Sequence, residues 1–401
     1  MSLTLSAHCQ AIAPSPTLAI DARAKEMKSQ GLDVIGFGAG EPDFDTPAHI
    51  CEAAATAIAR GMTRYTPVAG TPSLRRAICD KLARDNDLHY TPEQIIVSNG
   101  AKHSLFIAFQ ALLNPGDEVL IPTPWWVSYP EIVRMAGGVP VQVPTTEAQG
   151  FVADAATLAP YVTPRTKALI LNSPNNPNGS VWSRAQLADI AALAVARGFY
   201  VVSDEIYEKL IYDGETHVSI ASLGAEIAAQ TLVINGVSKA FAMTGWRIGY
   251  TAGPKPVIQA MTNYQSHSAS NPNSIAQHAA IAALEGGDET VRAMVSAFAE
   301  RRVVLVQGLN AIEGISCGMP KGAFYAMMNI QGVLGRCHQG RTLATALDFA
   351  DALLAAQKVA VVPGEGFDAP HYCRLSYALS TEALREGIAR IAAFVGELTL
   401  D

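Results

Sequence analysis

The sequence predicts an α/β protein in which helices sandwich a mostly parallel β-sheet and a smaller α+β domain lies beside it. Short apolar runs, closed by Gly, Pro, Asn or Ser, alternate with longer amphipathic stretches from about residue 46 to 286. Strands that alternate with helices form parallel sheets covered on both faces. The alternation stops after this block, so we expect a large domain at 46–286 and a small domain formed by 1–45 and 287–401.

Six apolar runs are the expected strands of the large sheet, because they are rich in Val and Ile and bounded by turn-forming residues. They are EQIIVSNG at 93–100, DEVLIPTP at 117–124, KALILNSP at 167–174, FYVVSDE at 199–205, TLVINGVSK at 231–239 and RIGYTAG at 247–253. Helical patterns at 101–113, 127–136, 184–197 and 256–266 lie between these runs. This order of strands and helices predicts helices on both faces of the sheet.

The C-terminal part has a different pattern. A long helix is expected at about 289–312, followed by short strands near 323–328 and 359–362 and a final helix at 381–398. The sequence shows no linker, repeat or low-complexity tract between the two parts. We therefore expect the two domains to pack tightly against each other.

The composition is that of a globular protein, because 49% of the 401 residues are hydrophobic and 16% are charged. The formal net charge of −7 argues against nucleic acid or an anionic membrane as a partner. No run approaches the roughly 20 apolar residues of a membrane helix, and no signal segment is visible, so we expect a cytoplasmic protein. The 6 cysteines and 9 histidines are dispersed without the spacings of zinc sites, so no metal site is expected.

Polar residues gather where four of the expected strands end. KALIL is followed by NSPNNPNG, FYVV by SDEIY, TLVI by NGVSKAFAMTGWRIG, and IIVS by NGAKHS at the start of a helix. In open α/β sheets, ligands bind in the crevice beyond the carboxyl ends of the strands. These four segments are therefore expected to converge on one site.

Lys239 and Asp204 are the candidate catalytic residues at this site. A lone Lys is usually a solvated surface residue, but Lys239 follows a buried strand, and a Lys in a pocket can lose its proton and form a Schiff base. Asp204 ends another strand, either as the cap of a turn or as a buried carboxylate that needs a cation such as a protonated pyridine nitrogen. Ser238, Arg247 and the backbone N–H groups at 100–102 are candidates to hold a phosphate.

Four motifs occur in order along the chain: N-P-N-G at 176–179, S-D-E-I-Y at 203–207, S-K-x₅-G-x-R-x-G at 238–249 and R-L-S-Y at 374–377. Together they resemble the class I, or fold-type I, pyridoxal-phosphate aminotransferases, over nearly the whole chain from about residue 34. GEPDFDTP, RYTPVAG, PWWVSYP and AFAMTGWRIGY are most similar to the prokaryotic aspartate aminotransferase branch, subgroup 1b. The resemblance implies the fold of that family, with seven strands in the large sheet.

The resemblance also implies a role for each site residue. Lys239, Asp204 and Tyr207 form the implied catalytic set, in which Lys239 carries pyridoxal 5'-phosphate and acts as the general base, while Asp204 pairs with the pyridine nitrogen. Arg374 binds the substrate α-carboxylate, helped by the backbone of Gly40. For the cofactor, the resemblance implies Asn176 and Tyr207 at the ring hydroxyl, Trp126 stacked on the ring, and Gly100, Ala101, Lys102, Ser238 and Arg247 at the phosphate. Tyr65 is implied to reach the phosphate from the second subunit of a homodimer. Trp126, Asn176 and Lys102 are also implied to face the substrate, with Lys102 at its distal carboxylate.

The implied activity is a ping-pong transfer of the amino group from aspartate or glutamate to 2-oxoglutarate or oxaloacetate. Aromatic, alanine-type and prephenate aminotransferases stay open as alternatives. A C–S β-lyase also stays open, because it has the same cofactor residues but releases ammonia, pyruvate and a thiol. Ala13 stands where some prephenate-active members carry a Lys, which argues against that alternative, and Asn178 replaces the commoner Thr of the N-P-T-G motif.

Two further classes are disfavoured. A regulator that uses this fold to sense the cofactor would carry an additional DNA-binding domain and a basic face, whereas about 30 residues precede the first expected strand and the net charge is negative. Gly36, Gly38 and Gly40 resemble a dinucleotide-binding fingerprint, but Pro42 follows them where a helix would have to begin. The sequence therefore favours an enzyme that uses pyridoxal phosphate.

Overall fold

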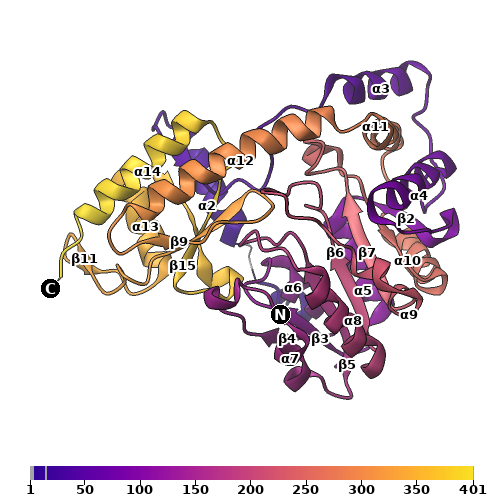
Figure 1. The fold of residues 1–401 in the computed structure, drawn as a ribbon. Helices are drawn as coiled ribbons and strands as arrows, with labels where there is room; N and C mark the ends of the chain where they lie inside the picture. The colour runs from indigo at the N-terminus through magenta and orange to yellow at the C-terminus, as the bar shows by residue number, and fades with distance from the viewer. Residues whose placement is uncertain (1–3, 14–15, 401) are drawn as a thin grey trace.

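The computed structural model describes residues 4–13 and 16–400 and contains a seven-stranded sheet in the order β2-β8-β7-β6-β5-β3-β4 (Figure 1). Within this sheet β8 pairs antiparallel with β2 and β7, and the other pairs are parallel. The bounds are β2 (Ile95–Ser98), β3 (Glu118–Pro122), β4 (Val139–Val143), β5 (Thr166–Asn172), β6 (Tyr200–Asp204), β7 (Thr231–Gly236) and β8 (Gly249–Ala252). The predicted fold class is confirmed, and the six predicted strands all lie in this sheet.

The strand pattern did not predict β4, although it belongs to the same sheet. β4 lies at the edge and pairs with β3, and its first four residues are exposed or half-buried. Pro140 interrupts its apolar pattern. Edge strands tolerate Pro because one side of their ladder carries no partner, so this strand is specified by its place in the sheet more than by its own sequence.

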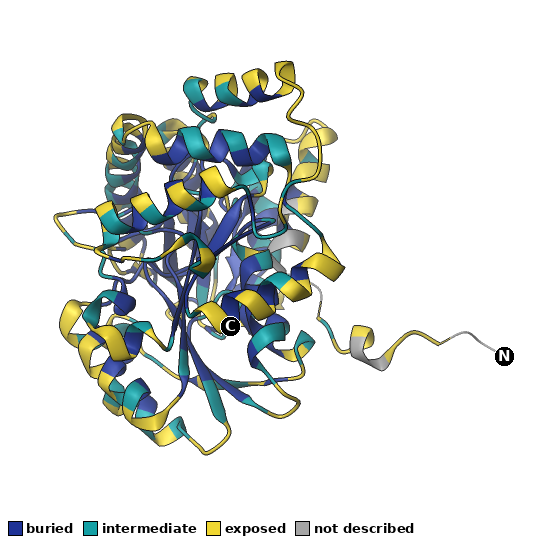
Figure 2. Ribbon diagram, turned by 90° about the vertical axis from the view of Figure 1, so that its right-hand side faces the viewer, coloured by how far each residue is buried: buried dark blue, intermediate teal, exposed yellow. Residues whose placement is uncertain are grey.

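Side chains that alternate along a strand are buried on opposite faces of the sheet. On β5, Ile170 packs with α5 (Ala101–Leu112), α6 (Ser128–Met135) and α10 (Lys255–Ser268), whereas Leu169 and Leu171 pack against α8 (Arg184–Arg197). A third cluster joins β2, β7 and β8 to α3 (Ala48–Ala59), α4 (Pro72–Asn86) and α11 (Ser274–Glu285). The buried residues accordingly lie in the strands and on the inner faces of the helices (Figure 2).

A second, smaller sheet has four strands in the order β14-β15-β10-β9, all antiparallel. Its strands are β9 (Ser316–Cys317), β10 (Tyr325–Asn329), β14 (Val362–Pro363) and β15 (Tyr372–Ser376). α12 (Glu289–Asn310), α13 (Ala346–Gln357) and α14 (Thr381–Gly396) share one apolar core with it (Figure 1). The predicted α+β part is therefore present, while the domain boundaries at residues 46 and 286 stay predictions.

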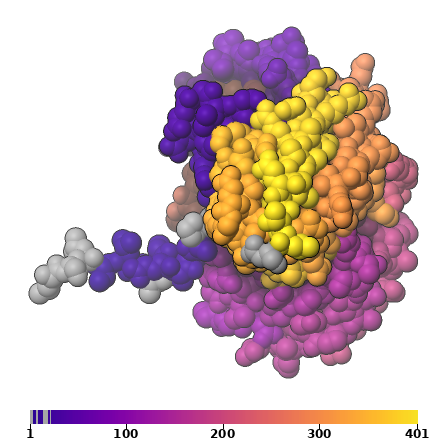
Figure 3. Space-filling view, turned by 90° about the vertical axis from the view of Figure 1, so that its left-hand side faces the viewer, coloured from indigo at the N-terminus to yellow at the C-terminus, as the bar shows by residue number. Residues whose placement is uncertain are grey.

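The N-terminal segment joins this C-terminal part. β1 (Ile35–Gly36) pairs in parallel with β13 (Val359–Ala360), and Phe37 is buried in the core that contains α12 and α14. Residues 4–13, which include α1 (Ala7–Gln10), project from the body of the molecule and lead into α2 (Pro16–Ser29) (Figure 3). The remaining short elements are α7 (Ala155–Leu158), α9 (Ala225–Ala228), β11 (Cys337–His338) and β12 (Arg341–Thr342). None of the described helices has the length and apolar character needed to cross a membrane.

Candidate active site

A cavity of about 320 Å³ lies at the carboxyl ends of β5, β6 and β7, where residues of β10 and β15 close its other side. Strands of the two sheets therefore contribute to one site. Of the residues predicted from the sequence, its lining contains Gly40, Ala101, Lys102, Trp126, Asn176, Asp204, Tyr207, Ser238, Lys239, Arg247 and Arg374. The predicted convergence of the four polar segments is thus observed in the structure, although the role of each residue stays a prediction.

Lys239 lies three residues beyond the end of β7, so its side chain enters the cavity from the carboxyl edge of the sheet. Its Nζ donates to the backbone oxygen of Gly40 and lies 5.9 Å from the centre of the Tyr207 ring. Burial lowers the pKa of Lys239 to about 8, with the cations Arg247 and Arg374 acting in the same direction and Glu41 against them. About a tenth of this amine is therefore uncharged at pH 7, far more than for a Lys with its ordinary pKa, and the uncharged form is the nucleophile.

Asp204, the last residue of β6, is a buried carboxylate without a cationic partner among the described residues. The Tyr129 hydroxyl donates to its Oδ2 at 2.7 Å, and the Ile206 N–H donates to its Oδ1 at 3.3 Å. Burial raises the pKa of Asp204 to about 6, although the hydrogen bond from Tyr129 opposes that rise. A buried carboxylate of this kind is matched by a ligand that brings its own cation.

The N-terminus of α5 and Arg247 form a cradle for an anion. Gly100 precedes α5 with a φ of 87°, and a Cβ atom there would lie 2.5 Å from Nη2 of Arg247. The guanidinium of Arg247 is held by the backbone oxygens of Thr244 at 3.0 Å and Asn99 at 3.2 Å, so it is fixed beside the free N–H groups of the helix. Ser238 and Ala101 complete this corner of the cavity. Backbone N–H groups and a guanidinium are the donors that bind phosphate.

Arg374 on β15 is a buried guanidinium, 2% exposed, with no Asp or Glu paired to it in the described part of the chain. Its Nη1 donates to Oδ1 of Asn176 at 3.1 Å, and its Nη2 donates to the backbone oxygen of Gly38 at 2.9 Å. Burial lowers the pKa of Arg374 from its ordinary value. Because a buried charge is costly without a counter-ion, the cavity is built to receive an anionic group here.

Comparisons with known proteins agree with this geometry. Residues 32–391 match the family model described as aminotransferase class I and II. The chain belongs to this aminotransferase family. The aspartate aminotransferase of Geobacillus stearothermophilus is 51% identical over 98% of this chain and 99% of its own, and the aspartate/prephenate aminotransferase of Thermus thermophilus is 48% identical over 98% and 99%. The crystal structure of the aspartate aminotransferase from Rhizobium meliloti superposes with a TM-score of 0.96 at 44% identity, covering 99% of this chain and 100% of that one.

Lys102 adds a further basic side chain to the pocket of this aminotransferase, besides Lys239, Arg247 and Arg374. Its Nζ lies 4.7 Å from the centre of the Trp126 ring, and burial together with the positive charge of Arg247 lowers its pKa. Lys102 lies on α5, which packs against the large sheet, and Arg374 lies on β15 of the small sheet, yet both line the same cavity. Apart from Arg247 in the phosphate cradle and Lys239, these two cations suit a ligand with two anionic groups.

Tyr65 is one of two predicted site residues that do not line the pocket, the other being Gly100. Its side chain is 91% exposed, and it is absent from the cavity lining. The resemblance assigned Tyr65 to the active site of a second subunit, so its position on the surface of a single chain leaves that assignment a prediction. Gly100 does not line the cavity either, but it packs directly against the guanidinium of Arg247, which does.

Sequence reasoning missed two tyrosines that line the pocket, Tyr129 and Tyr325. Tyr129 donates to Asp204, and its position three residues after Trp126, one turn away at the start of α6, is the pattern that could have identified it. The hydroxyl of Tyr325 lies 3.0 Å from that of Tyr207. Tyr325 belongs to β10 of the second sheet, so no local pattern in the sequence connects it to the site.

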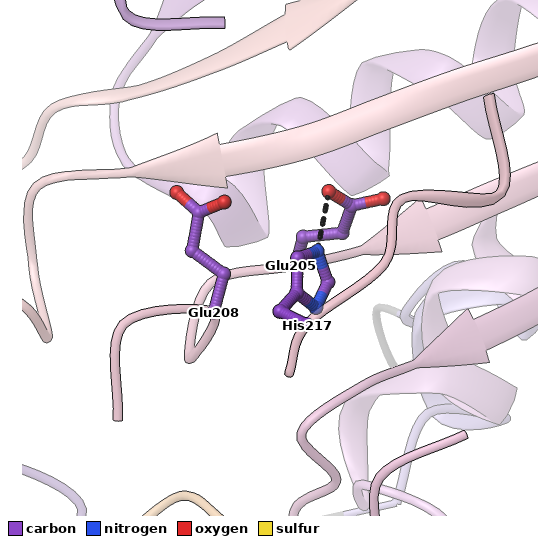
Figure 4. A group of neighbouring side chains, drawn as sticks. All are labelled: Glu205, Glu208 and His217. Carbon is purple, nitrogen blue, oxygen red and sulfur yellow. Dashed lines mark hydrogen bonds and ion pairs between the residues drawn. The ribbon is translucent and has the colours of Figure 1, made fainter. Parts of the chain in front are cut away.

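Glu205, Glu208 and His217 lie next to Asp204 and place potential metal-ligand atoms within 4.8 Å of one another (Figure 4). His217 Nε2 lies 3.0 Å from Oε2 of Glu205, and Lys81 forms an ion pair with Glu208. Although burial raises the pKa of Glu208, the charges of Lys81 and His217 and the hydrogen bonds from Lys81 and Asn86 together lower it to about 2. These contacts describe a buried ion-pair network behind the active-site strand.

Proposed function

We propose that this protein is a pyridoxal-phosphate-dependent aspartate aminotransferase, which moves the amino group of aspartate or glutamate to 2-oxoglutarate or oxaloacetate. The observation that supports it most is the set of charges left uncompensated in one cavity. Among the described residues, the buried carboxylate of Asp204 has no cation paired to it and the buried guanidinium of Arg374 no anion, and Lys239 in the same cavity has a pKa of about 8. A cofactor with a cationic ring nitrogen and a substrate with a carboxylate satisfy both groups.

The cavity fits pyridoxal phosphate group by group. Asp204 would hold the ring nitrogen, Asn176 and Tyr207 the ring hydroxyl, and Trp126 one face of the ring. The phosphate would lie in the cradle formed by Arg247, Ser238 and residues 100–102, where the missing Cβ of Gly100 leaves room for the guanidinium. When bound, this cofactor supplies an electron-poor ring that stabilises negative charge at the α-carbon of the amino acid.

Three side chains of the protein would bind the substrate and move its proton. Arg374 retains free N–H groups beyond the two that contact Asn176 and Gly38, and these would orient the substrate by its α-carboxylate. Lys239, as the free amine, would take the proton from the substrate α-carbon as general base, and its lowered pKa suits that task near neutral pH. Lys102 would bind the distal carboxylate, which favours aspartate and glutamate over monocarboxylic amino acids.

The site would be shared between two subunits of a homodimer. Tyr65 is 91% exposed in the single chain, and Ile58 and Met62 nearby are also exposed, at 57% and 37%. An aromatic side chain this exposed, with exposed apolar residues close to it in the sequence, suits burial against a second copy. Size-exclusion chromatography should give a dimer, and a fully active monomer would contradict this assignment.

The deciding experiment is an absorbance spectrum of the purified protein with pyridoxal phosphate, recorded before and after adding single amino acids without an acceptor. A visible band that aspartate or glutamate converts to the amine form of the cofactor would support the proposal. Conversion by aromatic or alanine-like donors alone would keep the aminotransferase and remove the role of Lys102. Pyruvate release from cysteine-type substrates, with the band unchanged, would favour a lyase.

A further inference from the structure

Tyr325 lies where the two sheets meet at the active site. It is the first residue of β10 and pairs with Ser376 of β15, two residues from Arg374 on the same face of the sheet. The side chain is 1% exposed and lines the cavity. Its hydroxyl also lies close to Gly40, because a Cβ built on Gly40 would lie 3.6 Å from it. Tyr325 therefore contacts the parts of the site proposed for substrate and for cofactor.

The ring of Tyr325 supports the guanidinium of Arg374. Cζ of Arg374 lies 4.4 Å from the centre of this ring and 5.1 Å from that of Phe367. Aromatic faces attract a guanidinium, most strongly when water is excluded, as it is around this 2% exposed side chain. Since no acidic residue in the described part of the chain pairs with Arg374, the rings and two oxygen acceptors fix its orientation before any carboxylate binds.

The hydroxyl of Tyr325 fixes a different group. It lies 3.0 Å from the hydroxyl of Tyr207, and the two rings meet edge to face with centres 5.8 Å apart. A hydroxyl has one proton to donate and two lone pairs that accept. If Tyr325 donates to Tyr207, the proton of Tyr207 is left free to point toward the cavity, where the ring oxygen of the cofactor would accept it.

We propose that Tyr325 is a positioning residue with two separable parts, a ring that orients Arg374 for the substrate α-carboxylate and a hydroxyl that orients Tyr207 for the ring oxygen of the cofactor. The inference rests on the proposed function. It assigns a link between substrate and cofactor binding to one side chain of the second sheet. Loss of the hydroxyl alone and loss of the whole ring must then have different effects.

Two substitutions separate the parts. Tyr325→Phe keeps the ring, so the dissociation constant of maleate, an unreactive dicarboxylate, should stay within about twofold of wild type in calorimetry of the cofactor-loaded protein. The same variant should raise the apparent pKa of the visible absorption band by about 0.5 to 1, because the ring oxygen loses part of its hydrogen-bond stabilisation. Tyr325→Leu should show that rise and also weaken maleate binding by about tenfold.

Tyr372→Phe is the matched control, since it removes a tyrosine hydroxyl that donates to Glu147 at 2.9 Å from the opposite end of β15. It should change neither measurement. The positioning role is overturned if Tyr325→Phe titrates like wild type, if Tyr325→Leu binds maleate like wild type, or if the control reproduces either change. Should the Leu variant fail to fold, Tyr325→Met replaces it in the maleate titration, and the titration of the Phe variant still decides the role of the hydroxyl. A wild-type protein that forms no visible band with pyridoxal phosphate refutes the proposed function itself, and the inference falls with it.

Discussion

Replacing Asp204 by Asn should make the cofactor-free protein more stable at pH 8, although the residue is proposed to be catalytic. Burial raises the pKa of Asp204 from 3.8 to about 6, with the Tyr129 hydrogen bond opposing the rise. When the folded pKa lies above the unfolded one, the contribution to stability is fully present below the unfolded pKa and is lost as the pH rises through the folded pKa. At pH 8 the wild-type protein therefore buries a charge that destabilises it.

The size of this effect follows from the gap between the two pKa values. At about 1.4 kcal/mol per pKa unit, the change from 3.8 to about 6 corresponds to about 3 kcal/mol. About 1 kcal/mol of this gain is lost in the variant. In the wild-type protein the Ile206 N–H donates to Asp204 at 3.3 Å, and the NH₂ group of Asn, itself a donor, cannot accept that hydrogen bond. With an unfolding entropy of about 2.1 cal/mol/K per residue over 401 residues, the remaining 2 kcal/mol raises the midpoint by about 2 to 3 °C.

Thermal unfolding of the cofactor-free proteins, followed by calorimetry between pH 4 and 8, provides the assay. The advantage of Asp204→Asn should shrink toward zero as the pH falls to 4, and added pyridoxal phosphate should reverse the order at pH 8. Tyr129→Phe serves as a control of opposite sign, because it removes the donor that stabilises the charge. A variant that melts at or below the wild-type temperature at pH 8, or with an advantage independent of pH, would refute the reasoning.

Three other predictions concern single residues of the pocket. The rate at which pyridoxal phosphate forms its visible band with the apoprotein should rise with pH through about 8, the pKa of Lys239, and a flat profile would contradict that assignment. Lys102→Ala should raise the KM for aspartate about tenfold or more and leave the KM for alanine unchanged; equal effects on both would remove its role. Gly100→Ala should weaken cofactor binding at least about tenfold in a fluorescence titration, because a Cβ there strains a φ of 87° and displaces Arg247. Unchanged affinity would show that the cradle is not used.

Local pattern was sufficient for the parts of the fold that are buried on both faces. The runs that became β5, β6 and β7 are continuous and apolar because both sides of those strands are covered by helices. β4 was not predicted, because it is an edge strand that contains Pro140 and has no continuous apolar pattern. The strands of the second sheet are short, as in β14 with its two residues, so they give little periodicity to read.

The residues of the candidate site also divide into those that local sequence patterns predict and those that they do not. Asp204 ends its strand, and Lys239 and Asn176 lie three and four residues beyond theirs, so the rule that ligands bind at the carboxyl ends of parallel strands identifies all three. Arg374 was named through its R-L-S-Y motif, since nothing in its local sequence points toward the large sheet. Tyr325 carries no such motif and enters the cavity through tertiary packing between two sheets. Contacts of this kind depend on distant parts of the chain and leave no local trace in the sequence.

The pairing of β1 with β13 has a consequence for synthesis of the protein. Gly36 finds its partner Ala360 more than three hundred residues later in the chain. At about 5 to 20 residues per second, the ribosome needs roughly 15 to 65 s to cover that distance. During that time β1 has no partner strand, and the core that buries Ile35 and Phe37 is incomplete, because part of it comes from α13 and α14. A nascent chain can complete its large sheet early, but its pocket lacks the cation proposed to bind the substrate carboxylate until Arg374 of β15 has been made.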